Sequence, residues 1–151
     1  MASDPQAAVA DRAAFQFRAD AGEVRAVLRR AVARFARQIS ADDAGTLELA
    51  LAEVLNNIVE HAYAGRPDGQ IRLTLARAPG ALACLVEDEG LPLPGLALPA
   101  GRFAPPAARV EDLAEGGWGW ALIRATTEDL AYQRQGAVNR LSFRVPLTAG
   151  A

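Results

Sequence analysis

The 151-residue sequence predicts an α+β domain, a two-layer α/β sandwich with helices over a mostly antiparallel sheet. Two observations favour this fold class. Apolar residues recur at helical spacing in two long segments of the first half, and they alternate with polar residues in two later hairpins. The predicted order is strand, helix, helix, two strands, helix and two strands, which is typical of helices packed on one sheet.

The N-terminal half supplies one strand and two helices. Residues 1–11 are small and rich in alanine, and we expect a flexible tail there. Aromatic and polar residues alternate over residues 15–18, which indicates a short strand. Residues 23–38 carry apolar side chains at helical spacing, with arginines on the other face. After a helix-start residue, Ser40, the next helix is predicted to run to about Tyr63.

The C-terminal half supplies two hairpins, a long loop and a helix. Alternation over residues 70–88 predicts the first hairpin. Residues 91–115 contain several prolines and show no convincing period, and a helix is predicted over residues 119–129. The second hairpin is predicted over residues 130–145, and residues 147–151 are expected to form a C-terminal tail.

Composition excludes several functional classes. The net charge of −2 gives no overall field that would attract nucleic acid. Cys84 is the single cysteine, so there is no intramolecular disulfide, and one cysteine with one histidine does not supply a zinc site. Cys84 lies in an apolar run, so we expect it to be buried. With no signal peptide and no run of about 20 apolar residues, we expect a cytoplasmic protein that binds no membrane.

The second predicted helix carries a polar row. Glu53 and Asn57 are four residues apart, so their side chains lie on one side of the helix, and His61 continues the row. The alternative is a solvated helix face, although the adjacent asparagines Asn56 and Asn57 are poor residues for one. Magnesium bound to nucleotide phosphates uses few protein oxygens, so Asn57 is a candidate ligand and Glu53 a candidate proton acceptor. His61 alone is more typical of packing at a helix end.

Two glycine turns add candidate cofactor-binding residues. Asp88 ends an apolar strand and could accept a hydrogen bond from an exocyclic amine, while Gly90 would let the backbone approach a flat ring. The same pair is also common in plain turns. Gly117, Trp118 and Gly119 open a predicted helix, where free backbone amides and the helix dipole favour phosphate.

The loop of residues 91–115 is predicted to be a lid. A loop of about 25 residues inside a compact domain is uncommon, and such loops are usually lids or disordered. Between an adenine contact and a phosphate contact, a lid would close over the nucleotide. Arg102 and Arg109 could both reach phosphate from this loop, and the sequence does not choose between them.

Together these motifs resemble the GHKL ATPase superfamily over residues 12–146. This superfamily includes the ATP domains of gyrase, Hsp90, histidine kinases and MutL, and its ATP-binding fold is the Bergerat fold. Within it, the chain is similar to the stand-alone anti-sigma-factor serine/threonine kinases of the RsbW and SpoIIAB type. The resemblance therefore implies an ATP-binding kinase domain that uses ATP and Mg²⁺.

The resemblance implies a role for each motif. Glu53 and Asn57 match the N-box, which implies that Glu53 is the general base and Asn57 the magnesium ligand. Asp88 and Gly90 match the first glycine box, which implies that Asp88 binds the adenine amino group. Residues 117–119 match the second glycine box, which implies backbone contacts with the phosphates.

The sequence departs from the family pattern at three places. Leu91 and Pro92 stand where many members have a further glycine at the start of the lid. Trp118 is bulkier than the usual aliphatic residue between the two glycines. Asn139 stands where a Gly-Thr pair is often found, which predicts the loss of one contact on the phosphate side.

The implied function is a partner switch. Such a kinase holds a sigma factor inactive and phosphorylates a serine or threonine on a small anti-anti-sigma (STAS-domain) protein, and homodimers are frequent in the family. The alternative is a non-catalytic ATP-binding module that regulates a sigma factor or another partner. An ATP-hydrolysing clamp is less favoured, because no transducer domain follows residue 151.

Overall fold

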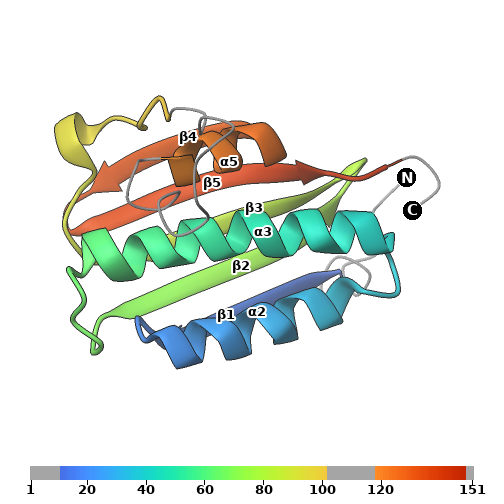
Figure 1. The fold of residues 1–151 in the computed structure, drawn as a ribbon, viewed down its shortest axis with the longest axis horizontal. Helices are drawn as coiled ribbons and strands as arrows, with labels where there is room; N and C mark the ends of the chain where they lie inside the picture. The colour runs from blue at the N-terminus through green and yellow to red at the C-terminus, as the bar shows by residue number, and fades with distance from the viewer. Residues whose placement is uncertain (1–10, 102–117, 149–151) are drawn as a thin grey trace, which may run out of the picture.

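The computed structural model describes residues 11–101 and 118–148, which form two layers (Figure 1). The strands are β1 (Arg12–Arg18), β2 (Gln70–Ala78), β3 (Ala81–Asp88), β4 (Glu128–Gln135) and β5 (Val138–Pro146). The helices are α2 (Ala21–Phe35), α3 (Ala41–Asn57) and α5 (Trp118–Thr126), with a π-helical turn η1 (Ile58–Ala62) and a 3-10 turn η2 (Pro94–Leu96). Most of the predicted N-terminal tail and of the lid lies outside the described residues.

The predicted two-layer α+β fold is confirmed. The five-stranded sheet has the order β1-β2-β3-β5-β4, and every neighbouring pair of strands is antiparallel. Figure 1 shows the helices on one face of this sheet, where α3 lies between α2 and α5 and contacts both. Helix α2 ends three residues before the predicted boundary, and α5 also ends three residues early, because the chain already enters β4 at Glu128.

Local side-chain caps explain where the two long helices begin. The Asp20 carboxylate accepts a hydrogen bond from the Glu23 N–H (3.1 Å) at the start of α2. The Ser40 hydroxyl accepts one from the Asp43 N–H (3.0 Å) at the start of α3. Such caps satisfy backbone donors that have no partner inside the helix, and each contributes about 1 kcal/mol.

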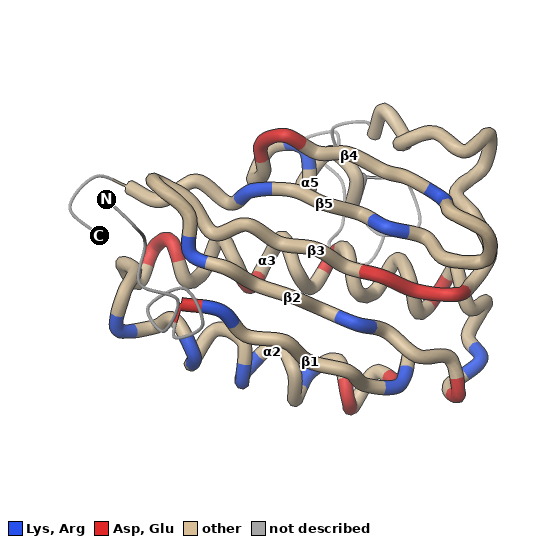
Figure 2. The backbone as a smooth tube through the Cα atoms, turned by 180° about the vertical axis from the view of Figure 1, so that it is seen from behind, with Lys and Arg blue, Asp and Glu red and all other residues tan. Residues whose placement is uncertain are grey.

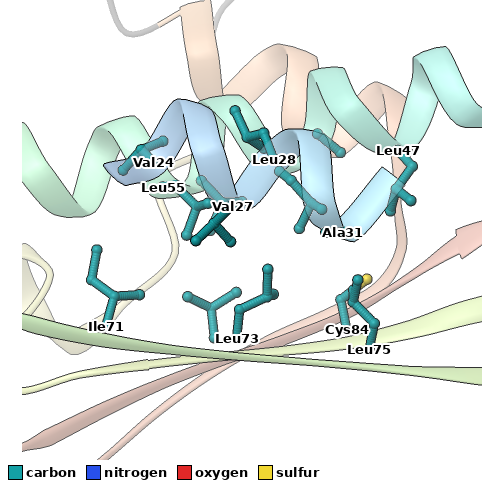
Figure 3. Packing of buried hydrophobic residues seen from close by; sticks show 14 of the residues in the cluster. Val24, Val27, Leu28, Ala31, Leu47, Leu55, Ile71, Leu73, Leu75 and Cys84 are labelled. Atoms are coloured by element: carbon teal, nitrogen blue, oxygen red, sulfur yellow. The ribbon is translucent and has the colours of Figure 1, made fainter. Parts of the chain in front are cut away.

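The core lies between the helices and the inner face of the sheet (Figure 3). Helix α2 buries an apolar stripe that includes Val24, Val27 and Leu28. These side chains face Ile71 and Leu73 of the sheet. Cys84 is buried in the same cluster, as predicted, and burial raises the pKa of its thiol to about 12.

Strand register arranges the inner face of the sheet in rows of residues that run across neighbouring strands. We call the first of these the core row, and it consists of Phe15, Leu73, Val86, Leu141 and Tyr132. The next one, which we call the site row, consists of Phe17, Ile71, Asp88, Asn139 and Arg134. The site row changes from apolar to polar at β3, and this change positions the functional site.

The outer face of the sheet has no helix in front of it among the described residues (Figure 2). Charged residues of alternating sign cross it at Arg72, Glu87 and Arg140, which the register places side by side. Arg140 and Glu87 form an ion pair of 3.7 Å. No helix within the described ranges is long and apolar enough to cross a membrane.

The packed structure extends two residues beyond the predicted domain end at residue 146. The Leu147 N–H donates to the Gly80 carbonyl (2.9 Å). The backbone N–H and the hydroxyl of Thr148 both donate to Asp43 Oδ2, at 2.9 and 3.0 Å. The bond from the Thr148 backbone holds the pKa of the buried Asp43 below its usual value. The first two residues of the predicted C-terminal tail are therefore tied to α3 and to the β2–β3 turn.

Candidate functional site

The polar row predicted on the second helix lies where that helix changes its geometry. Glu53 and Asn57 occupy the last turns of α3, and the following five residues form the π-helical turn rather than more α-helix. The Tyr63 N–H donates to the Ile58 carbonyl (3.0 Å), which is the five-residue step of a π turn. The single helix predicted up to Tyr63 is thus an α-helix that ends at Asn57 and a π turn, a feature that often marks functional sites.

Glu53 lies against the first turn of α5. A Cβ atom on Gly119 would lie 2.7 Å from Glu53 Oε2, so a larger residue there would require the flexible end of the Glu53 side chain to move. The two motifs are far apart in the sequence, and the packing of α5 against α3 brings them together. Gly117 and the side chain of Trp118, the other predicted phosphate-side residues, lie outside the described part of the chain.

The environment of Glu53 favours its protonated form. Partial burial raises the pKa of its carboxyl group, and the negative charge of Glu60, two turns further along, raises it again. A carboxylate with a raised pKa is a stronger proton acceptor than one with the ordinary value.

Asp88 lies at the end of β3 and lines a cavity, with 6% of its surface exposed. Its Oδ1 accepts hydrogen bonds from the Gly90 N–H (2.9 Å) and from Asn139 Nδ2 (2.8 Å). No hydrogen bond from the described residues reaches Oδ2. Burial raises the pKa of Asp88, while the bonds from Asn139 and Gly90 and the charge of Arg134 oppose the rise.

Gly90 joins the end of β3 to the π turn. A Cβ atom at this position would lie 2.4 Å from the Ala62 carbonyl oxygen, and the next residue, Leu91, donates its N–H to that oxygen (2.7 Å). Tyr63 adds a second link, because its hydroxyl accepts the Glu89 N–H (2.7 Å). The structure therefore explains Gly90 by a close backbone approach inside the protein.

Asn139, one of the departures from the family pattern, lies beside Asp88. The register places it directly opposite Asp88 on β3 and opposite Arg134 on β4. Its Nδ2 also lies near the carbonyl oxygens of Gly90 (3.2 Å) and Leu91 (3.0 Å). The pairing of β5 with β3 decides this position, and the predicted loss of a phosphate-side contact stays a prediction.

A cavity of about 230 Å³ brings several of the predicted residues together. It is lined by Asn57, Ile58, His61, Ala62, Asp88, Leu91, Pro92, Leu93, Pro94, Trp120, Tyr132, Asn139 and Leu141. Most of this lining is apolar, while Asp88, Asn57 and Asn139 supply polar groups. An apolar cavity with a few convergent polar groups is typical of a small-molecule site.

Asn57, the predicted magnesium ligand, lines the cavity. Its Nδ2 is buried without a hydrogen-bond partner among the described residues, so the protein leaves the carboxamide uncommitted. No group of three or more histidine, cysteine, aspartate or glutamate residues in that part of the chain could hold a metal ion. Magnesium binds a carboxamide through its oxygen, so Asn57 could hold the ion only with its amide turned round, which places the oxygen at the unpartnered position.

The start of the predicted lid is tied to the body of the protein. The Leu93 N–H donates to the Tyr132 hydroxyl (3.0 Å). Further along, Arg124 Nε on α5 donates to the Pro99 carbonyl (2.9 Å). The two candidate phosphate contacts from the lid, Arg102 and Arg109, lie outside the described residues.

Three site residues were missed as such by the sequence reasoning. Tyr132, Arg134 and Asn139 surround Asp88 and the start of the lid. A signal for Asn139 was present, because the inward positions of its strand continue as Leu141 and Phe143. A polar residue at an inward position of an otherwise apolar row needs a buried partner.

Comparison with known proteins shows similarity to a family, to a curated protein and to solved structures. Residues 17–145 match the family described as Histidine kinase-like ATPase domain. The Serine/threonine-protein kinase BtrW of Bordetella bronchiseptica is 35% identical over 99 residues, which are 65% of this chain and 67% of that protein. The solved structure of the Erythrobacter litoralis EL346 blue-light activated histidine kinase matches 74% of this chain at 25% identity, with a TM-score of 0.49. The chain spans only a third, 33%, of the length of that kinase.

Proposed function

The chain belongs to the family of histidine kinase-like ATPase domains, and from this premise we propose that it is an ATP-dependent serine/threonine kinase and anti-sigma factor. Membership confirms the predicted GHKL relationship and implies ATP binding. The proposed substrate is a serine or threonine on a STAS-domain anti-anti-sigma protein. The similarity to a protein named as a serine/threonine-protein kinase supports phosphoryl transfer to a protein.

The observation that carries the proposal is the contact between Glu53 and Gly119. Free backbone amides in the first turn of α5 would attract the phosphates of ATP. Glu53 lies at this same turn, so a proton acceptor would lie beside the group to be transferred. Asn57 would hold Mg²⁺ on the phosphates, where the ion would neutralise negative charge as it develops.

The proposed reaction transfers one phosphoryl group and one proton. The hydroxyl oxygen of the substrate protein forms a bond to the γ-phosphorus, and the bond from that phosphorus to the bridging oxygen breaks, so that ADP leaves. The hydroxyl proton passes to the Glu53 carboxylate. The raised pKa of Glu53 suits this step, because it brings the base closer to the pH at which the protein operates.

The cavity would hold the base of the nucleotide. Asp88 Oδ2 would accept a hydrogen bond from the amine of adenine, and the side chains of Leu91, Pro92 and Trp120 would contact the ring. We further propose that the protein acts in the cytoplasm, that it binds its sigma factor when the STAS protein is phosphorylated, and that it works as a homodimer.

The proposal is tested by measuring ATP binding and phosphate transfer separately. Binding is followed by tryptophan fluorescence, since Trp120 lines the cavity, and transfer by mass spectrometry of a STAS partner incubated with ATP and Mg²⁺. Removing a general base lowers the rate by about 10² to 10⁴-fold, so Glu53→Gln should show that loss while still binding ATP. Glu48→Gln, on the exposed face of the same helix, is the matched control and should transfer at the wild-type rate.

Two results would contradict the proposal. Undiminished transfer by Glu53→Gln would remove the proposed mechanism. Wild-type protein that binds ATP but leaves every STAS partner unmodified would instead support the non-catalytic ATP-binding regulatory module.

A further inference from the structure

Arg134 and Asn139 stand in one row with Asp88, and their hydrogen bonds have a defined direction. Arg134 Nη1 donates to Asn139 Oδ1 (2.9 Å) and to the Gly90 carbonyl (2.9 Å). The Tyr132 hydroxyl, which already accepts a bond from the Leu93 N–H, donates its own proton to Asn139 Oδ1 (2.6 Å). The oxygen of Asn139 therefore faces two donors on the β4 side.

This arrangement excludes the flipped orientation of the Asn139 carboxamide. A guanidinium group carries only hydrogen-bond donors, so the atom of Asn139 that meets Arg134 must be the oxygen. The amide nitrogen then faces Asp88, where it lies 2.8 Å from Oδ1. An amide NH₂ group donates, so Asp88 Oδ1 must act as an acceptor.

The turn that follows Asp88 also requires its Oδ1 to act as a hydrogen-bond acceptor. The Gly90 N–H donates to Oδ1 as well, so two donors meet this oxygen and a proton there would have no place. Burial acts against the charged form of Asp88, and the row of donors that begins at Arg134 counteracts it. Oδ2 is left as the acceptor for a ligand.

We propose that Arg134 is a positioning residue that acts through Asn139 to keep Asp88 a hydrogen-bond acceptor, so that the cavity selects a purine nucleotide with an exocyclic amine. This inference rests on the proposed function, because it takes a nucleoside triphosphate as the ligand of the cavity. An amine at this position of the ring donates to Oδ2. A carbonyl oxygen at the same position would meet the lone pairs of Oδ2 and be rejected.

The other groups around Asp88 do not supply this effect. They are His61 and Tyr63 from the π turn and its end, and Arg72, Glu87 and Glu89 around a hollow on the outer face. Among the described residues, Arg134 is the one charge that lowers the pKa of Asp88. Arg134 thus sets the direction of the hydrogen bonds through Asn139 and also lowers the pKa of Asp88.

The inference is tested by the pH dependence of nucleotide binding in Arg134→Met, measured with ATP and with ITP in the presence of Mg²⁺. ITP carries a carbonyl oxygen in place of the adenine amine. Without Arg134, the pKa of Asp88 rises, so Asp88 becomes protonated at a higher pH and stops accepting. Loss of a hydrogen bond within a charged network predicts that ATP binding by the variant is about tenfold weaker than wild type where its Asp88 is protonated, and approaches the wild-type affinity as pH rises. The ATP-to-ITP preference should fall over the same range.

Controls separate this effect from a loss of structure. Comparing each variant with wild type at the same pH removes the titration of the nucleotide phosphates. Arg140→Met makes the same charge change on the outer face beside Asn139, where Arg140 pairs with Glu87, and it should leave the pH profile unchanged. Arg134→Lys keeps the charge and the donors, and it should restore much of the wild-type profile. If Arg134→Met does not fold, Arg134→Gln serves instead and should shift the profile in the same direction.

The outcomes decide the inference separately from the proposed function. A constant ratio of variant to wild-type affinity from pH 6 to 8, with an unchanged ATP-to-ITP preference, would overturn the role of Arg134 while ATP binding by the wild type stands. Wild-type protein that binds no ATP at any pH would overturn the proposed function itself.

Discussion

The core row and the site row lie two residues apart along the same strands, yet they hold the fold together by different means. In the core row, Leu73 and Val86 are almost fully buried and belong to the apolar core. In the site row, Asp88 and Asn139 are almost as buried, but they are joined by hydrogen bonds. Burial is the same at both places, so it does not distinguish a core position from a functional one.

The difference teaches how this sheet accommodates a polar site. Buried polar groups cost free energy unless they are hydrogen bonded, and each polar group of the site row has a partner on the next strand or in the next turn. Two groups lack such a partner among the described residues, Asp88 Oδ2 and the buried Nδ2 of Asn57, and both residues line the cavity proposed for the nucleotide. The polar groups of the site row are therefore hydrogen bonded to one another, and Asp88 Oδ2 is the acceptor left for a ligand.

The largest effect on stability is expected from the core row. Leu73→Ala should lower the free energy of unfolding by about 2–5 kcal/mol, because it opens a cavity in the core that the helices cannot close. Urea unfolding measures the change. Arg72→Ala, next to it but on the exposed outer face, should change stability by about 0.5 kcal/mol or less. Equal losses in both variants would contradict this account of the core row.

The next largest loss of stability is expected when an apolar side chain, as in the core row, replaces a polar one in the site row. Asn139→Leu removes the partners of Asp88, Arg134 and Tyr132, and we expect a loss of about 3 kcal/mol, since unpaired buried polar groups remain. Chemical denaturation measures this loss. A variant as stable as the wild type would show that the hydrogen bonds of the site row contribute nothing to the fold.

A smaller effect is expected where the site row meets the π turn. Gly90→Ala places a methyl group 2.4 Å from the Ala62 carbonyl, so the backbone must shift, at a cost of about 2 kcal/mol. Gly45→Ala in α3 meets nothing within 4 Å and should instead stabilise the helix, by about 1 kcal/mol. Thermal unfolding of the two variants compares them directly. A stabilising Gly90→Ala would show that the contact with Ala62 is loose.

The smallest effect on stability is expected from Asp88→Asn, and it should depend on pH. Burial raises the pKa of Asp88 in the folded protein, so its carboxyl group favours folding most when protonated, below its unfolded pKa, and this advantage is lost as pH rises through the folded pKa. At pH 7 the variant should be more stable than the wild type. The gap should close as pH falls.

The same variant should lose ATP binding, because the asparagine would turn an NH₂ group toward the cavity in place of the acceptor oxygen. Unfolding experiments at several pH values together with ATP titration test both expectations. A variant that is less stable than the wild type at pH 7 would show that the charge of Asp88 supports the fold.

The sequence by itself determined the order and type of the elements and the polar row of α3. These features depend on local periodicity, so the segments 23–38 and 70–88 were predicted close to their observed bounds. Glu53, Asn57 and Asp88 were singled out as candidates in a similar way, because a polar residue in an apolar pattern is visible in the sequence alone.

Only the tertiary structure decided which of these residues meet. The pairing of β3 with β5 puts Asn139 opposite Asp88, and the packing of α5 on α3 puts Gly119 against Glu53. The π turn likewise depends on contacts from outside its own helix, such as the bond between Leu91 and Ala62. Contacts between distant segments depend on register and layer packing, and a local pattern in the sequence does not contain them.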